Sequence, residues 1–344
     1  MSMRIRVGKV EIGGGAPIAV QSMTKTRTSD LEATISQIRR LVDAGCEIVR
    51  VGVPDEESAR AISHIKASID VPIVADVHFD HRVAIMAIEH GADKIRINPG
   101  TIGARWKVEE VVRAAKERGI PIRVGANSGS IPPDLRNRYG KVEALVEAVL
   151  REVSILEGMG FHSIVVSAKA SDVDVSIEAY KELSRRVDYP IHVGITEAGF
   201  GIQGIIRSAV GIGAILSSGI GDTVRVSLTG DPVREVGVAY EILASLGLRE
   251  RRSPLIVSCP TCARSEFDVE WMASRIWEEL KGERKGVRVA VMGCAVNGPG
   301  EARDSDIGIA GTRSGAVVFV KGKVIKRVKK EEALEAVISE LKGR

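Results

Sequence analysis

The sequence predicts a (β/α)8 TIM-type barrel over residues 1–252, followed by a smaller α+β domain over residues 253–344. Eight short runs rich in Val and Ile recur in the first 230 residues, and amphipathic stretches of helical period separate most of them. Eight alternations of strand and helix favour a barrel over a doubly wound sheet. From about residue 254 the spacing of these runs changes, which indicates a second unit.

The eight expected barrel strands follow one another along the chain. They are 18–23, 47–54, 72–78, 94–100, 121–127, 163–169, 190–196 and 223–229. Helices are expected in the gaps, for example over 31–45 and 56–69. The longest gap lies between the fifth and sixth strands, and its Pro-containing stretch at 130–140 predicts an inserted loop.

The second domain shows a different order of elements. Strands are expected over 254–259, 287–294 and 306–311, with a further β-rich run over 316–328. Helical periodicity covers 267–281 and 331–342. Strands and helices in this order predict a compact α+β module.

Composition limits the function. Only 3% of the residues are aromatic, which argues against nucleic-acid modules that stack bases on exposed rings. A formal net charge of +4 decides little. The N-terminus has no apolar signal segment and no run is long enough to span a membrane, so a cytoplasmic protein without membrane or nucleic-acid partners is expected.

Polar side chains alternate with apolar ones inside the barrel runs. In a parallel barrel covered by helices the outward strand face is apolar, so the polar set is expected to point into the barrel. It lies toward the C-terminal end of each run, at the mouth where barrel active sites form. The inward set comprises the cations Arg50, Arg96, Arg123, Lys169 and Arg225, together with Asp76, His78, Asn98, Asn127, Ser167 and Ser227.

Burying five cations in one pocket costs free energy unless an anion neutralises them. Asp76 and Glu197 can neutralise only part of that positive charge. Because arginine forks match phosphate oxygens, the sequence predicts a phosphorylated or diphosphorylated substrate. For any single arginine, a structural ion pair within the barrel is the competing interpretation.

Two further features of the barrel suggest other chemistry. Residues 199–204 read GFGIQG, a dinucleotide-type pattern, but they follow the seventh barrel strand with no Rossmann unit around them. A glycine-rich turn opening a helix there suits a barrel phosphate site instead. Lys169, at the end of the sixth strand, could form a Schiff base, so a lyase or aldolase with a structural zinc domain is the alternative function.

Three of the four cysteines, Cys259, Cys262 and Cys294, fall in turns that follow strands of the second domain. Every histidine precedes residue 193, so no local imidazole can complete a four-ligand site. Glu301, at the end of the NGPGE turn, is the best candidate for the fourth ligand. An exchangeable oxygen beside thiolates favours an iron–sulfur cluster over zinc. Cys46 is expected to be a buried, structural side chain.

Taken together, these motifs resemble the 4-hydroxy-3-methylbut-2-enyl diphosphate synthase family over nearly the whole chain. The most specific are CPTCAR, which starts at Cys259, and GCAVNGPGE, which ends at Glu301. The resemblance implies a [4Fe-4S] cluster held by Cys259, Cys262, Cys294 and Glu301. It also implies reduction of 2-C-methyl-D-erythritol 2,4-cyclodiphosphate to (E)-4-hydroxy-3-methylbut-2-enyl diphosphate, with ring opening and loss of water.

The resemblance carries roles onto individual residues. Glu197 is the implied proton donor to the departing oxygen, and Glu301 is the ligand that would yield its iron to the substrate. The implied diphosphate-binding groups are Arg50, His78, Arg96, Arg123, Asn127, Lys169, Arg225 and Ser227, with Asp76 and Asn98 as further polar positions.

The family also implies partners. Because no flavin site or credible nicotinamide motif is present, both electrons would come from an external ferredoxin or flavodoxin, and a homodimer is expected. Lys25 stands where many relatives carry Asn, and its role is left open. The inserted domain of plant-type members is missing, as in the short bacterial form.

Overall fold

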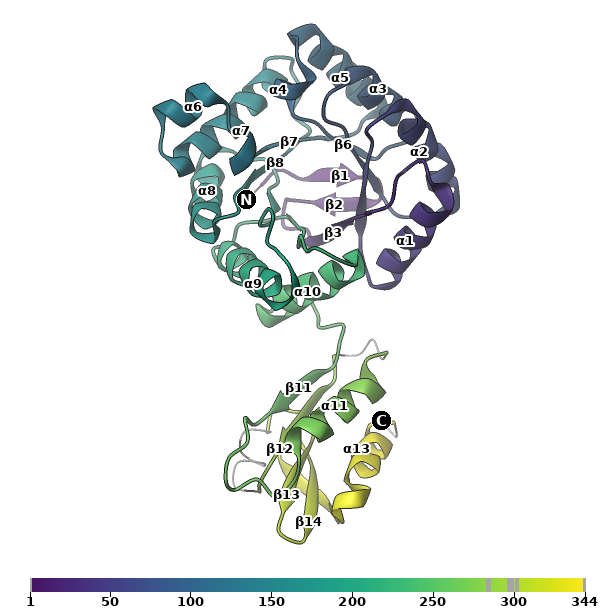
Figure 1. Ribbon diagram of the computed structural model, residues 1–344, viewed down its shortest axis with the longest axis vertical. Helices are drawn as coiled ribbons and strands as arrows, with labels where there is room; N and C mark the ends of the chain where they lie inside the picture. Colours follow the sequence, from purple (N-terminus) through teal and green to yellow (C-terminus); the bar gives the residue numbers. More distant parts are fainter. Residues whose placement is uncertain (1, 283–285, 296–299, 301–302, 343–344) are drawn as a thin grey trace. The chain divides into compact units, whose positions relative to one another are not determined.

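The computed structural model describes residues 2–282, 286–295, 300 and 303–342 (Figure 1). Contacts within the chain divide it into two units, Met1–Arg249 and Glu250–Arg344. The sequence placed this boundary after residue 252, in the same segment between the last barrel helix and the first strand of the second unit.

The first unit is a closed parallel barrel. Its eight strands follow the order β8-β7-β6-β5-β4-β3-β10-β9, and a parallel bridge between Val166 and Ile191 joins β8 to β9. The predicted barrel is therefore confirmed, strand by strand. The strands are β3 (Ala19–Met23), β4 (Ile48–Gly52), β5 (Ile73–Asp76), β6 (Lys94–Arg96), β7 (Ile122–Asn127), β8 (Ile164–Lys169), β9 (His192–Val193) and β10 (Thr223–Val224).

Helices surround this ring, and aspartates start several of them. Asp30, Asp55, Asp80 and Asp231 each accept a hydrogen bond from a first-turn backbone N–H, which satisfies a donor that the helix itself cannot pair. The helices are α1 (Leu31–Asp43), α2 (Glu56–Ser68), α3 (His81–Glu89), α4 (Pro99–Ile102), α5 (Arg105–Arg118), α6 (Pro133–Arg138), α7 (Lys141–Glu157), α8 (Val173–Arg186), α9 (Gly201–Ser217) and α10 (Pro232–Ser245), with a 3-10 turn at Ser128–Ser130.

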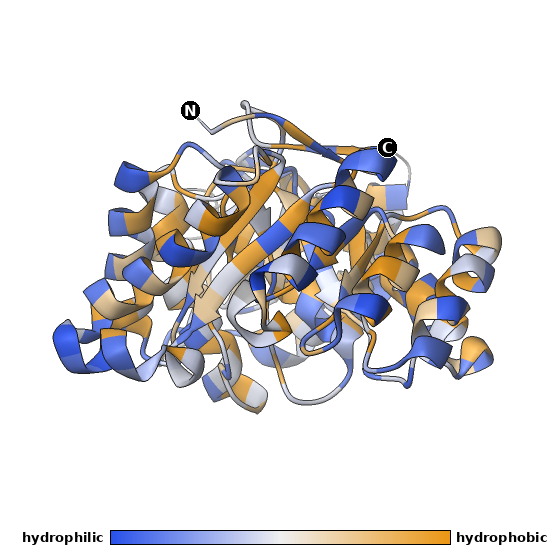
Figure 2. Cartoon of the chain, turned by 90° about the horizontal axis from the view of Figure 1, so that it is seen from above, coloured by the Kyte–Doolittle hydropathy of each residue, from blue (hydrophilic) through white to orange (hydrophobic). Residues whose placement is uncertain are grey.

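Apolar strands and the inner faces of the helices form the core. Figure 2 shows mostly orange strands enclosed by helices whose outward turns are largely blue. The stretch at 130–140 differs from its prediction as a loop, because it contains α6. Pro133 lies in the first turn of that helix, where its fixed φ suits the helical backbone and no N–H is required.

A hairpin closes the N-terminal end of the barrel. Strands β1 (Ile5–Val7) and β2 (Val10–Ile12) pair antiparallel, and Figure 1 shows them crossing the ring. Their side chains form one buried apolar cluster with Ile48, Val74 and Val165 of the barrel strands. Water is thereby excluded from the bottom of the barrel, so polar inward side chains can be reached only from the C-terminal ends of the strands.

Over its described residues, the second unit is a five-stranded mixed sheet, in the order β11-β12-β13-β14-β15, accompanied by helices α11 and α13. Its described elements are β11 (Leu255–Ser258), α11 (Val269–Leu280), β12 (Arg288–Met292), β13 (Ile307–Thr312), β14 (Gly315–Val320), β15 (Lys323–Val328), a 3-10 turn at Lys330–Glu332 and α13 (Ala333–Lys342). The β-rich run at 316–328 is an antiparallel hairpin that turns at Lys321, whose φ is 47°. The α+β prediction is confirmed.

Among the described residues, no helix is both long enough and apolar enough to cross a membrane. The cytoplasmic location stays a prediction.

Candidate functional site

Asp76, at the end of β5, is the centre of a buried polar cluster inside the barrel. Its carboxylate accepts a hydrogen bond from Arg50 Nη2 at 2.5 Å, and its other oxygen lies 3.4 Å from Arg96 Nη1. His78 Nε2 lies 3.4 Å from the same carboxylate and 2.9 Å from Arg96 Nη1. Strand register explains the grouping, because Gly52 pairs with Asp76 and Asp76 pairs with Arg96.

The charges around Asp76 reverse the effect of its burial. Burial alone would raise the pKa of Asp76, but the charges of Arg50 and Arg96 and the hydrogen bond from His78 hold it far below its ordinary value. The carboxylate is therefore ionised at every physiological pH. Its single negative charge balances only one of the two arginine charges, Arg50 and Arg96, that it contacts.

Two more cations, Arg123 and Lys169, are buried beside this cluster at 4% and 6% exposure. Burial lowers the pKa of Lys169 well below its ordinary value, and the charges of Arg123 and Arg225 lower it further. Burial also lowers the pKa of Arg123, with Arg50 and Arg96 adding to the effect. Because a guanidinium stays protonated in proteins, the barrel holds this charge at an electrostatic cost.

Several buried donors of the cluster have no hydrogen-bond partner among the described residues. They include Nε and Nη1 of Arg123, Nε of Arg50 and Nε of Arg96. Buried donors in native proteins are nearly always paired, so orphaned ones need a water or a ligand. Three positively charged side chains with free donors fit an anion rich in oxygen atoms.

Arg225, which follows β10, is held by a residue that the sequence analysis did not select. Its Nε lies 3.6 Å from Glu235 Oε2, and Glu235, on α10, is 1% exposed. Lys25 donates to the carbonyl of Leu228 at 2.6 Å and lies 3.3 Å from Glu235 Oε1. Lys25 thus ties the segment after β3 to the segment after β10, which gives that residue a structural role.

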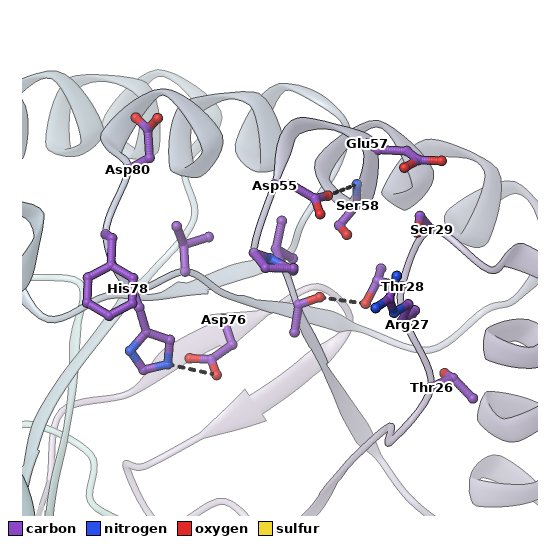
Figure 3. Close-up of a pocket in the computed structure, with 15 residues that line it drawn as sticks. Thr26, Arg27, Thr28, Ser29, Asp55, Glu57, Ser58, Asp76, His78 and Asp80 are labelled. Atoms are coloured by element: carbon purple, nitrogen blue, oxygen red, sulfur yellow. Dashed lines mark hydrogen bonds and ion pairs between the residues drawn. The ribbon is translucent and has the colours of Figure 1, made fainter.

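A cavity of about 590 Å³ opens beside Asp76, over the C-terminal ends of β3, β4 and β5 (Figure 3). Of the predicted site residues, Asp76 and His78 line it, and Figure 3 shows the His78 ring beside the Asp76 carboxylate. Thr28 donates to the carbonyl of Gly52, and Asp55 accepts from the backbone N–H of Ser58. The remaining predicted residues lie outside the lining of this cavity.

The other predicted polar residues lie at the strand ends. Asn127 ends β7, Asn98 follows β6 and accepts a hydrogen bond from the Thr101 N–H at 3.2 Å, and Ser227 follows β10; all three are half-buried. Glu197 is exposed in the turn after β9, with a φ of 49°. A non-glycine residue in the left-handed region is strained, and such strain clusters at functional sites.

Gly194, just after β9, leaves room for Lys169. A Cβ at this position would lie 2.8 Å from Lys169 Nζ and 2.6 Å from the carbonyl oxygen of Arg225. The end of the Lys169 side chain therefore lies against the backbone just after β9, at a position where glycine has no side chain. The next helix, α9, begins at Gly201 within the GFGIQG motif, and no side chain caps its first N–H groups.

The three cysteines of the second unit line one cavity of about 150 Å³. Cys259 directly follows β11, and its Sγ accepts a hydrogen bond from the Gly293 N–H at 3.1 Å. Thr261 has a φ of 62° and turns the chain between Cys259 and Cys262. N–H donors to sulfur are typical of cysteine sites that carry negatively charged thiolates.

Gly293 permits this arrangement. A Cβ there would meet Ser265 Oγ at 2.3 Å, so only glycine lets the end of β12 lie against the turn after Cys262. Glu301, the predicted fourth ligand, lies outside the described residues. Within those residues, no group of three or more His, Cys, Asp or Glu side chains is placed to hold a metal ion.

Cys46 is buried as predicted, at 4% exposure. Burial raises the pKa of its thiol to about 12, so it stays protonated and unreactive. It lies just before β4 in the barrel unit, whereas the other three cysteines belong to the second unit.

Sequence reasoning also missed two buried ionisable residues beside the cluster. Lys94, on β6, is fully buried, and its Nζ has no hydrogen-bond partner among the described residues. Lys94 and Arg96 flank Ile95 in the sequence, so the period-two pattern that selected Arg96 could also have placed Lys94 on the inward face of the strand. Glu152, on α7, accepts from the Gly125 N–H at 3.0 Å, and burial raises its pKa to about 7. No local pattern distinguishes Glu152 from the other acids of its helix.

Comparison with known families covers both units. Residues 2–240 match the family model of the GcpE TIM-barrel domain, and residues 255–343 match that of the GcpE protein C-terminal domain. The chain belongs to the GcpE family. Membership of the GcpE family confirms the resemblance inferred from the motifs and the prediction that the protein is an enzyme.

Curated relatives match over nearly their whole length. A protein of Caldanaerobacter subterraneus subsp. tengcongensis is 53% identical, over 99% of this chain and 96% of its own. One of Thermodesulfovibrio yellowstonii is 53% identical, over 98% and 97%, and one of Geobacillus kaustophilus 54%, over 98% and 90%. All three are named 4-hydroxy-3-methylbut-2-en-1-yl diphosphate synthase (flavodoxin).

Similarity to solved structures concerns the barrel fold alone. A dihydropteroate synthase of Yersinia pestis gives a TM-score of 0.51 at 14% identity, covering 72% of this chain and 100% of that one. A type I 3-dehydroquinate dehydratase of Clostridium difficile gives 0.51 at 16%, covering 72% and 98%. At such identities only the shared architecture follows.

Proposed function

We propose that this GcpE-family enzyme reduces 2-C-methyl-D-erythritol 2,4-cyclodiphosphate to (E)-4-hydroxy-3-methylbut-2-enyl diphosphate. In fully protonated forms, the substrate with two electrons and two protons gives the product and one water. The observation that carries the proposal is the group of buried cations around Asp76, whose free donors call for a phosphate-rich ligand. The names of the curated relatives support the same reaction.

The cations bind the diphosphate and hold it inside the barrel. Arg50, Arg96, Arg123, Lys169 and Arg225 offer donors from five different strands or strand ends. Replacing water by fixed cations strengthens each contact, because the barrel interior has a low dielectric constant. As the ring opens, the phosphate oxygen that leaves carbon gains charge, and the same cations stabilise it. His78, Asn127 and Ser227 orient the diphosphate from the mouth, with Asp76 and Asn98 fixing neighbouring groups.

Glu197 is the proposed proton donor. It stands in the turn between β9 and α9, on the C-terminal side of the barrel where the diphosphate groups gather. Its strained backbone fixes the direction in which the side chain leaves the turn. A carboxylic acid at this place delivers a proton to the oxygen that departs as water.

The thiolate set of the second unit fits a [4Fe-4S] cluster. Cys259, Cys262 and Cys294 line one cavity, and Glu301 is the proposed fourth ligand. A cluster bound there would supply electrons one at a time to the substrate. The electrons would come from a flavodoxin or ferredoxin, in agreement with the word flavodoxin in the relatives' names.

We also propose a homodimer. Three apolar side chains of α9, Ile202, Ile206 and Val210, are 72%, 53% and 55% exposed and recur every four residues, so they share one face of the helix. A stripe of this kind is typical of a surface that another subunit covers.

The test is anaerobic reconstitution with iron and sulfide. We expect four irons per chain, a reduced-cluster signal in electron paramagnetic resonance that changes on adding the cyclic diphosphate, and product by mass spectrometry. Cys294→Ala should lose iron, whereas Cys46→Ala, the matched control, should keep it. Zinc without iron, together with borohydride trapping of a carbonyl substrate on Lys169, would instead support the lyase.

A further inference from the structure

One edge of the second unit carries a dense positive charge that the proposed reaction does not use. Six of the ten residues from 321 to 330 are Lys or Arg, and none is Asp or Glu. All six are exposed, and none forms an ion pair with a described residue. This set, called the basic edge below, consists of Lys321, Lys323, Lys326, Arg327, Lys329 and Lys330.

The basic edge lies on β15 and the residues that flank it, and β15 is the outermost strand of the five-stranded sheet. Lysines on an edge strand often serve only to prevent pairing with another strand. That explanation does not cover Val324 and Ile325, which are 48% and 47% exposed in the middle of the set. Exposed apolar side chains within a charged rim have the composition of a protein interface.

A bulge shapes this surface. Val318 pairs with Lys326 while Phe319 pairs with Val324, so Ile325 is the extra residue of β15. A bulge and flanking lysines disfavour addition of a further strand. A partner would therefore contact side chains of β15 and not extend the sheet.

Strand direction brings the basic edge to the cysteine end of the sheet. β11, β12 and β13 are parallel, and two antiparallel steps give β15 the same direction. Cys259 and Cys294 follow the ends of β11 and β12, and Lys329 follows the end of β15. The cysteines and the last cations of the edge thus share one end of the sheet.

Register gives the separation across the sheet. Met292 pairs with Ala310, Ala310 with Val317, and Val317 with Arg327. Arg327 is therefore level with Met292, two residues before Cys294, at three strand spacings or about 14 Å. A carrier docked on the edge would bring its redox group near the cysteine cavity.

We propose that the basic edge is the docking surface for an acidic, flavodoxin-type electron-carrier protein. The inference rests on the proposed function, because that reaction consumes two electrons that the chain does not itself store. Each reduced carrier gives up one electron on docking, so two encounters reduce one substrate molecule. Complementary charge raises the rate of such encounters and makes them sensitive to salt.

The experiment compares two charge reversals of equal size in the reconstituted enzyme. The test variant is Lys326→Glu/Arg327→Glu/Lys329→Glu. The control is Arg39→Glu/Arg113→Glu/Arg118→Glu, at three exposed positions on barrel helices. Turnover of the cyclic diphosphate is measured with a purified, reduced flavodoxin and, separately, with reduced methyl viologen, which needs no protein docking.

We expect the test variant to lose at least about tenfold in kcat/KM for flavodoxin, along with the salt dependence of that rate. Its rate with methyl viologen and both rates of the control should be unchanged. An unchanged flavodoxin rate would overturn the docking proposal. So would an equal loss with both reductants. If the wild-type enzyme turns over with neither reductant, the proposed function fails instead, and flavodoxin binding measured by calorimetry still tests the surface.

Discussion

Removing the charge of Asp76 tests whether one carboxylate holds the cation cluster together. In Asp76→Asn the side chain keeps its shape, but Arg50 and Arg96 lose the anion that lies 2.5 Å and 3.4 Å from them. Both arginines are buried, at 9% and 6% exposure, so water in the adjacent cavity replaces the lost partner only in part. The variant should therefore be destabilised as a broken buried ion pair, by about 3–5 kcal/mol.

The loss can be followed by thermal or urea unfolding of the whole chain at pH 7. For a barrel of this size, about 3 kcal/mol corresponds to a fall in Tm of roughly 6–12 °C. Asp80→Asn is the matched control. Asp80 caps α3 by accepting from the Arg82 N–H, and Asn caps about equally well, so this variant should change stability by only a few tenths of a kcal/mol.

The pH dependence supplies a second check with a defined sign. The pKa of Asp76 is lower in the folded chain than its ordinary value of 3.8. Its contribution is therefore fully present above the unfolded pKa and is lost as the pH falls below about 4. The gap in stability between wild type and Asp76→Asn should narrow there. A loss at pH 7 below about 1 kcal/mol would refute the reasoning, because the arginines would then need no carboxylate.

Three more outcomes follow from named residues. Burial and the charges of Arg123 and Arg50 lower the pKa of Lys94 from 10.5 to about 7, so the free energy of unfolding of the wild type should rise as the pH increases from about 7 to 10.5. In Lys94→Met this rise should be absent, and below pH 7 the variant should be the more stable protein. Urea unfolding at a series of pH values measures both effects. Glu197→Gln should lower kcat by about 10²–10⁴ with little change in KM, whereas a full rate would exclude it as proton donor. Ile206→Glu should convert the dimer to monomer in light scattering, and unaltered mass would exclude the α9 stripe.

Much of the fold is determined by local sequence. Period-two runs of Val and Ile separated by helical stretches predict every barrel strand, because parallel strands buried on both sides need β-branched side chains throughout. The same alternation selects Arg50, Arg96 and Arg123, since a side chain that cannot face the helices must face the interior. The three cysteines of CPTCAR and GCAVNGPGE are equally local, and they predict a cluster-type ligand set before any contact is known.

What the sequence could not determine depends on distances between segments far apart in the chain. Glu235 meets Arg225, Lys25 and the Leu228 backbone only after α10 packs against β3. The packing of the β1–β2 hairpin across the N-terminal end of the barrel likewise results from closing the ring. The burial of Lys94 and Glu152 beside the cations depends on the same closure. A carboxylate on a helix looks the same in sequence whether it faces water or an arginine. Only tertiary packing sets its burial and its neighbours, and these determine its pKa and its role.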